Sequence, residues 1–296
     1  MIRLEGILAP VVTPFDDAGE VDAAGFVRNV RAHLAAGLSG IVVTGSTGEA
    51  ALLDDDERMR LVELARREVP AGTPLIAGTG SESTRATLAR SRLAAERGAD
   101  AVLVVAPHYY GDAMTVEALR EHYRRVADES PVPVLLYSIP KYMHFAIAPE
   151  LVAELALHEN VVGIKDSSGD PAQFTRYLAS QSESFRVLTG NGPFYREALR
   201  LGASGAILAV SLFAPAHARA VLDAHQRGHD QEASDAQGAL SPLASIVGAM
   251  GVAGIKAALD RVGLVGGTPR PPLQPIAGAA LARVEQLLRD GALAAA

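Results

Sequence analysis

Lys165 is the residue whose type and place in the sequence point most directly to chemistry. It ends the run Val161–Lys165, which is otherwise wholly apolar. An amine held away from water is favoured in its neutral form, and a neutral lysine can attack a ketone to form a Schiff base. A lysine in such a place can also be structural, paired with Asp166 or another carboxylate. Its position alone leaves both roles open.

The segment Gly45–Glu49, with the sequence Gly-Ser-Thr-Gly-Glu, is a second candidate. Backbone N–H groups exposed between glycines bind anions, and the hydroxyls of Ser46 and Thr47 add donors. This combination suits a carboxylate. The segment lacks the lysine of a phosphate-binding P-loop, which argues against a nucleotide. The same composition is also common in ordinary loops, so the motif alone is a weak signal.

Three tyrosines complete the candidates. Tyr137 ends the apolar run Val134–Tyr137, where its hydroxyl needs a polar partner. It is either a core tyrosine or a proton donor and acceptor in a site. Tyr109 and Tyr110 follow another apolar run, and taken alone they indicate an interface patch.

These candidates sit at or after the ends of short apolar runs. The runs are rich in Val, Ile and Leu and do not alternate with polar residues, which is typical of parallel strands buried on both faces. Amphipathic stretches between them predict helices. The eight runs are Ile7–Val12, Ile41–Thr44, Leu75–Gly78, Ala101–Val105, Val134–Tyr137, Val161–Lys165, Val187–Thr189 and Ala206–Val210.

Local signals mark where the predicted helices begin and end. Asp54 and Glu57 are spaced as a capping box, and Ser83 opens a helix that Gly98 closes. Pro149 and Pro171 stand where first-turn prolines belong. Eight strand–helix units of similar length predict a closed (β/α)8 TIM barrel, whose site lies at the carboxyl ends of the strands. An open doubly wound sheet is the alternative.

The pattern changes to helix alone after about residue 227. Three helices are predicted, at Gln231–Val247, Val252–Val262 and Ile276–Leu288. We therefore expect residues 1–226 to form the barrel and residues 227–296 to form a helical extension packed on it as part of one structural unit.

The amino-acid composition argues against several classes of function. The 296 residues carry a formal net charge of −7 without a basic run, which argues against nucleic-acid binding. There is no cysteine, and the eight histidines lack metal-ligand spacing, so no metal site is expected. We find no signal peptide and no apolar stretch of about 18 residues, so we expect a cytoplasmic protein without a membrane segment.

Several motifs in the right order resemble the class I pyruvate-dependent aldolases, the dihydrodipicolinate synthase and N-acetylneuraminate lyase family. The resemblance covers nearly the whole chain. The motifs are Gly6–Phe15, Gly45–Glu49, Tyr137–Pro140 and Gly163–Asp170.

The resemblance implies roles for these residues. Lys165 would form the Schiff base with pyruvate or another 2-oxo acid, so that no cofactor is needed. Tyr137 would shuttle protons beside it. Tyr109 would reach into a neighbouring subunit of a homotetramer and complete a hydroxyl relay with Ser46 and Tyr137. Substrate-binding residues would be Thr47, Gly48, Ser167, Gly190 and Ile207.

The residues after Tyr137–Pro140 distinguish the subfamilies of this family. Synthases of lysine biosynthesis usually keep an arginine there to hold the carboxylate of the aldehyde, and this chain has Tyr142 at that place, next to Lys141. The closest likeness is to the 4-hydroxy-2-oxoglutarate aldolase type, which cleaves 4-hydroxy-2-oxo acids to pyruvate and an aldehyde. Two alternatives stay open. One is 4-hydroxy-tetrahydrodipicolinate synthase, which condenses pyruvate with aspartate semialdehyde. The other is a barrel that binds a 2-oxo acid without turning it over.

Overall fold

The computed structural model of the chain, which describes residues 2–293, is a closed barrel of eight parallel strands. Each strand pairs with the next in the chain, and β8 pairs with β1 through Gly205 and Gly6. The predicted TIM barrel is confirmed, and the closing pair excludes an open sheet. The strands are β1 (Gly6–Pro10), β2 (Gly40–Val43), β3 (Leu75–Gly78), β4 (Ala101–Val105), β5 (Val134–Ser138), β6 (Val161–Asp166), β7 (Arg186–Thr189) and β8 (Gly205–Ile207).

One predicted strand is shorter than expected. The run Ala206–Val210 continues as strand only to Ile207, and the residues from Ala209 to Leu212 form a 3-10 turn, η4. The turn is held locally, because the Ser211 hydroxyl donates to the carbonyl of Leu208 at 2.7 Å. The last residues of this apolar run therefore lie outside the barrel strand. Hydrophobicity alone does not show where a buried strand ends and a buried turn begins.

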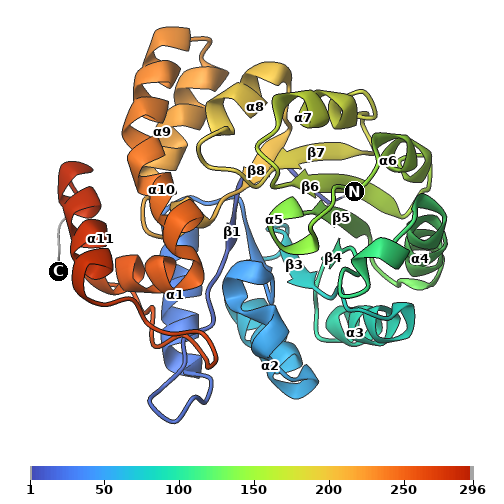
Figure 1. Cartoon of the computed structure of the whole chain (residues 1–296), viewed down its shortest axis with the longest axis horizontal. Helices are drawn as coiled ribbons and strands as arrows, with labels where there is room; N and C mark the ends of the chain where they lie inside the picture. The colour runs from blue at the N-terminus through green and yellow to red at the C-terminus, as the bar shows by residue number, and fades with distance from the viewer. Residues whose placement is uncertain (1, 294–296) are drawn as a thin grey trace.

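Helices surround the strands (Figure 1). The capping box of Asp54 and Glu57 is formed, and Pro149 and Pro171 each occupy the first turn of a helix. The helices between strands are α1 (Ala23–Ala35), α2 (Asp55–Glu68), α3 (Thr84–Glu96), α4 (Val116–Glu129), α5 (Pro140–Met143), α6 (Pro149–Leu155), α7 (Pro171–Leu178) and α8 (Tyr195–Leu201), with 3-10 turns η1 (Ser46–Gly48), η2 (Ala50–Leu52) and η3 (Gly111–Ala113).

Three helices follow β8. The helix α9 (Pro215–Gln226) completes the barrel, and α10 (Asp230–Arg261) and α11 (Gly278–Asp290) come after it. Figure 1 shows α10 running beside α9, with α11 next to it. Two of the predicted helices are joined in α10, which is interrupted where Gly251 adopts φ 59° and ψ −147°. The break lies between the two segments that the sequence predicts as separate helices.

The expectation that no stretch could span a membrane needs correction for α10. This helix is long and apolar enough to do so by length and composition, with a mean hydropathy of 1.6 over its most apolar window. Residues 236–255 carry no charged side chain, but many of them are Gly, Ala and Ser, so the stretch does not stand out as a hydrophobic run. In the structure α10 contacts α9, α11 and η4, and it lines a cavity of the barrel.

Candidate functional site

A cavity of about 210 Å³ opens at the carboxyl ends of the strands. This is the end of a TIM barrel at which active sites lie. Of the nine residues expected to act on substrate, seven line it: Ser46, Thr47, Tyr137, Lys165, Ser167, Gly190 and Ile207. The strand ends therefore bring together residues that are far apart in the sequence.

Lys165 projects into this cavity from β6 and is only 6% exposed. Within residues 2–293 its amine forms no ion pair, whereas the other buried lysine, Lys256, is paired with Glu49. The neighbouring Asp166 is engaged elsewhere, since its carboxylate accepts hydrogen bonds from the N–H and the hydroxyl of Ser168. Burial also raises the pKa of Asp166 to about 6. The structural alternative, a Lys165–Asp166 pair, is not present.

Tyr137 lies beside Lys165. The two residues are register partners in the adjacent strands β5 and β6, and the Lys165 amine lies 4.1 Å from the centroid of the Tyr137 ring. Tyr177 shows what a satisfied core tyrosine looks like here, because its hydroxyl donates to the carbonyl of Ile147 at 2.5 Å. The Tyr137 hydroxyl has no such partner among the residues that the structure describes. It is therefore available to a ligand in the cavity.

The hydroxyl loop is folded as the 3-10 turn η1. Its carbonyls at Gly45 and Ser46 accept the N–H groups of Gly48 and Glu49 at 3.0 and 3.2 Å. The N–H groups and hydroxyls of Ser46 and Thr47 make no hydrogen bond to another described residue, and both residues line the cavity. Such a cluster of unused donors fits a carboxylate.

The turn is entered and left through unusual backbone conformations. Thr44 has φ 51° and Glu49 has φ 56°, so two residues other than glycine occupy the left-handed region. Each such residue costs roughly 1–3 kcal/mol and persists only where its surroundings hold it. Thr44 is held by its hydroxyl, which donates to the carbonyl of Gly78 at 3.0 Å.

Gly190 packs directly against the central lysine. A Cβ atom built on Gly190 would lie 2.7 Å from Cε of Lys165 and would overlap the Ser167 hydroxyl. Glycine is therefore required at this position for the amine and the hydroxyl to keep their places. Ser167 is itself fixed through its backbone N–H, which donates to the carbonyl of Ser138 at 2.9 Å.

Two expected residues do not line the cavity. Gly48 is the buried last residue of the turn, and its carbonyl accepts a hydrogen bond from the Thr13 hydroxyl at 2.8 Å, so the structure gives Gly48 a supporting role. Tyr109 lies after β4 with 77% of its surface exposed, and its N–H donates to the Glu82 carboxylate at 2.9 Å. Its expected role in a neighbouring subunit stays a prediction.

One wall of the cavity is not predicted by the sequence motifs. Residues of α10 on both sides of the break at Gly251 line it, among them Ser245, Val247, Gly248 and Val252. The only signal was the high content of glycine within a helical pattern, which marks close packing or function as often as a weak helix. Asn191, in the loop after β7, also lines the cavity.

The residues after Tyr137–Pro140 form the outer part of the cavity. Both Lys141 and Tyr142 line it, and the Lys141 amine donates to the carbonyl of Gly248 at 3.2 Å. Burial raises the pKa of Tyr142, so its hydroxyl stays protonated near neutral pH. No arginine lines the cavity within the described part of the chain.

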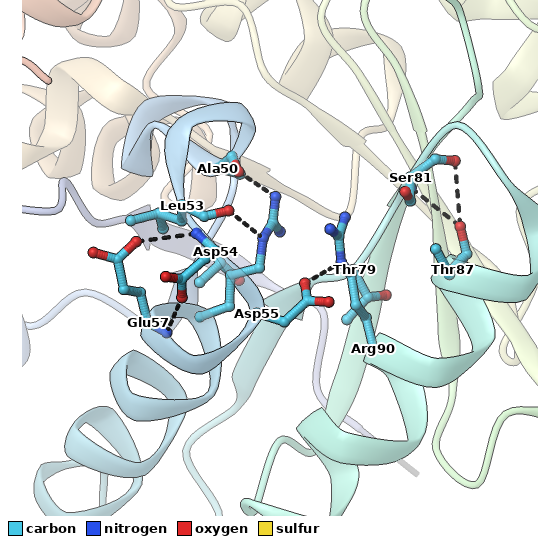
Figure 2. Close-up of polar contacts among 12 residues, drawn as sticks. Ala50, Leu53, Asp54, Asp55, Glu57, Thr79, Ser81, Thr87 and Arg90 are labelled. Carbon is cyan, nitrogen blue, oxygen red and sulfur yellow. Dashed lines mark hydrogen bonds and ion pairs between the residues drawn. The ribbon is translucent and has the colours of Figure 1, made fainter. Parts of the chain in front are cut away.

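A second cavity of about 600 Å³ adjoins the first and shares Ser46, Tyr137 and Tyr142 with it. Arg58 lies in its wall and donates to the carbonyls of Ala50 and Leu53, and burial lowers the pKa of Arg58 to about 10. Figure 2 shows the neighbouring polar contacts, including the Asp54–Glu57 capping box and the Arg90–Asp55 ion pair. Residues 2–293 contain no group of three His, Cys, Asp or Glu side chains arranged to hold a metal ion.

Comparison with known proteins agrees with this geometry. The model of the dihydrodipicolinate synthetase family matches residues 3–290. A 4-hydroxy-tetrahydrodipicolinate synthase from Xanthomonas axonopodis pv. citri is 37% identical over 290 residues, which cover 98% of this chain and 95% of that protein. The family resemblance expected from the motifs is therefore confirmed.

Solved structures show the same architecture over almost the full length. A dihydrodipicolinate synthase from Bacillus anthracis superposes with a TM-score of 0.94 at 31% identity, covering 98% of this chain and 99% of that one. The dihydrodipicolinate synthase from Acinetobacter baumannii, solved in complex with pyruvate, superposes with a TM-score of 0.93 at 29% identity and covers the same shares.

Proposed function

Because the chain belongs to the dihydrodipicolinate synthetase family, we propose that Lys165 is the residue that forms a Schiff base with pyruvate. The family consists of class I pyruvate-dependent aldolases, which use a lysine Schiff base and no metal cofactor. The observation that supports the assignment is the unpaired Lys165 amine, buried in the cavity beside Tyr137. The intact lysine, tyrosine and hydroxyl turn argue against a barrel that only binds a 2-oxo acid.

The proposed chemistry follows from the arrangement of these groups. The Lys165 amine attacks the 2-keto carbon and water leaves, which gives an iminium. The iminium accepts the electron pair of the C3–C4 bond when that bond breaks, and an enamine of pyruvate remains. The Tyr137 hydroxyl receives the proton of the C4 hydroxyl as the aldehyde forms, and it passes its own proton on towards C3 of the enamine. Protonation of the enamine and hydrolysis then release pyruvate and restore the lysine.

The turn η1 (Ser46–Gly48) would hold the carboxylate of the 2-oxo acid. Its unused donors lie at the cavity wall, and binding the carboxylate there orients the keto carbon towards Lys165. Ser167, Gly190 and Ile207 would shape the rest of the pyruvate half-site. The Acinetobacter relative, solved with pyruvate, supports this choice of ligand.

We propose cleavage of 4-hydroxy-2-oxo acids as the reaction. The observation that favours it is the outer cavity, where Tyr142 and Lys141 take the place at which a synthase is expected to keep an arginine. A single ammonium does not reproduce the two parallel hydrogen bonds of a guanidinium with a carboxylate. Losing such a contact costs roughly 1.5–3 kcal/mol, or about 10- to 150-fold in affinity.

The names of the relatives support a second candidate. The Xanthomonas protein is called a 4-hydroxy-tetrahydrodipicolinate synthase, and the same site would run in the direction of condensation with aspartate semialdehyde. Lys141 would then supply the cation for the carboxylate of that aldehyde, and it would have to give up its hydrogen bond to Gly248.

One experiment separates the two reactions. Coupled assays at matched enzyme concentration compare condensation of pyruvate with aspartate semialdehyde against cleavage of a panel of 4-hydroxy-2-oxo acids. We expect weak or no condensation and a higher kcat/KM for at least one cleavage substrate. A kcat/KM for aspartate semialdehyde above that of every cleavage substrate would establish the synthase instead.

Membership of the family also suggests an oligomeric state and a cellular location. We propose a cytoplasmic homotetramer, built as a dimer of dimers, in which Tyr109 of one copy completes the site of another. The exposed Tyr109 lies on the loop after β4, and its neighbour His108 lines the second cavity, which reaches Ser46 and Tyr137. The proposed partners are small molecules, a 2-oxo acid and an aldehyde, and neither nucleic acid nor a membrane.

A further inference from the structure

The residue directly after the hydroxyl turn η1 (Ser46–Gly48) is tied to the C-terminal helices. Glu49 has a fully buried carboxylate, and one of its oxygens lies 2.5 Å from the amine of Lys256 in α10. The other oxygen accepts the backbone N–H of Arg270 at 2.8 Å. Both partners come from segments more than 200 positions away in the chain.

The two partners are themselves firmly held. The Lys256 amine also donates to the carbonyl of Thr268 at 3.1 Å, and it lies 4.5 Å from the centroid of the Phe15 ring. The Arg270 guanidinium donates to both carboxylate oxygens of Glu57 and to the carbonyl of Leu52. The segment after α10 that contains Arg270 is thus fixed to residues 49–57, which directly follow η1.

The contacts of Glu49 with Lys256 and Arg270 affect the cavity through the backbone conformation of Glu49. Glu49 is left-handed, and its N–H closes the turn by donating to the carbonyl of Ser46. A residue other than glycine keeps that conformation only where its surroundings hold it. The described contacts that hold the Glu49 side chain are those with Lys256 and Arg270.

The helix α10 also lines the cavity. Ile255, the neighbour of Lys256, lines the cavity together with Val252 and Gly251. The part of α10 that follows the break at Gly251 therefore forms part of the cavity wall and also holds the residue after the turn, through Lys256. A shift of this helix would change both surfaces at once.

We infer that Glu49 is a positioning residue for the carboxylate site, held by Lys256 and Arg270 from the C-terminal helices. It sets the place of the unused donors of Ser46 and Thr47, although it does not line the substrate cavity itself. The inference rests on the proposed function, since it assumes that this turn binds the carboxylate of a 2-oxo acid. It assigns the ion pair a role in substrate affinity beyond fold stability.

The test must avoid leaving a buried charge alone, because such a charge can unfold the protein. We therefore choose the double variant Glu49→Gln with Lys256→Met, which keeps the size of both side chains and removes both charges. The matched control is Arg261→Met. It breaks the Arg261–Glu285 ion pair between α10 and α11, at 2.9 Å, away from the turn. Thermal unfolding of each variant shows that it is folded.

The readout is cyanoborohydride trapping on Lys165, measured against the concentration of pyruvate and, separately, of methyl pyruvate. The ester has the same keto group and lacks the carboxylate. In the double variant we expect the half-saturating concentration of pyruvate to rise by about 10- to 100-fold, the scale of a misplacement of about 1 Å. For methyl pyruvate we expect a change below about threefold, and for the control variant no change with either ligand.

Two results would overturn the inference. One is an equal rise for pyruvate and methyl pyruvate, which is what general loosening of the site produces. The other is no rise for pyruvate in a folded double variant. If the wild-type protein traps neither ligand, the proposed function itself fails, and the inference fails with it.

Discussion

Lys165 and Tyr137 face one another across neighbouring strands, with the lysine amine 4.1 Å from the centroid of the tyrosine ring. Both side chains line one cavity, and neither has an ion-pair or hydrogen-bond partner among residues 2–293. Buried polar groups are normally satisfied, so an unpartnered pair in a cavity is typical of groups that await a ligand.

We predict that borohydride and pyruvate reduce a three-carbon adduct onto Lys165. The chain contains only two other lysines, and Lys256 is engaged by Glu49 while Lys141 bonds to Gly248. Mass spectrometry of the digested protein locates the adduct. Lys165→Ala should abolish both trapping and turnover while the thermal midpoint stays close to that of the wild type. An adduct on Lys141 or Lys256 would contradict the assignment.

Tyr137→Phe should keep trapping with pyruvate and lose most turnover. The ring remains beside the lysine, and only the hydroxyl that moves the proton is removed. Positioned proton transfer is worth roughly 100- to 10,000-fold in rate. Steady-state cleavage assays measure the loss, and Tyr177→Phe serves as a control because that hydroxyl is used by the core. Wild-type kcat in the Tyr137 variant would make it a packing residue.

Gly190→Ala should impair Schiff-base formation without unfolding the barrel. The added methyl would lie 2.7 Å from Cε of Lys165, so the amine has to move. A displacement of about 1 Å at a reacting group costs about 100-fold in rate. The matched control is Gly238→Ala in α10, where a Cβ meets no atom within 4 Å. Equal trapping rates in the two variants would show that the lysine tolerates the displacement.

Acid should destabilise the fold partly through His33. Burial lowers the pKa of His33 from its ordinary 6.5 to about 4. Between pH 6.5 and 4 the unfolded chain therefore binds a proton at His33 that the folded chain does not bind. The stability that the neutral form contributes is present above pH 6.5 and is lost as the pH falls towards 4. Each such proton changes the free energy of unfolding by about 1.4 kcal/mol per pH unit.

The change is measured by urea unfolding at a series of pH values. His33→Phe should flatten the dependence between pH 6.5 and 4 by about one proton. His122 has its pKa lowered to about 4 in the same way, so some slope should remain. A His33 variant with the full wild-type slope would remove this explanation.

The residue sequence by itself determined the barrel and most of the site. Apolar runs without alternation predict strands buried on both faces, and eight of them with intervening helices leave few architectures. Because parallel strands place their carboxyl ends at one rim, the residues that end them had to meet there. Lys165, Tyr137 and the turn at Ser46 could be found in this way.

Only the tertiary structure decided how the C-terminal helices take part. Nothing in the local pattern around Lys256 or Gly251 indicates which strand end they will face, since that depends on how α10 packs across the barrel. The pairing of Glu49 with Lys256 joins positions that no periodicity connects. Local sequence encodes local conformation and burial, whereas contacts between distant segments are set by the packing of the whole chain.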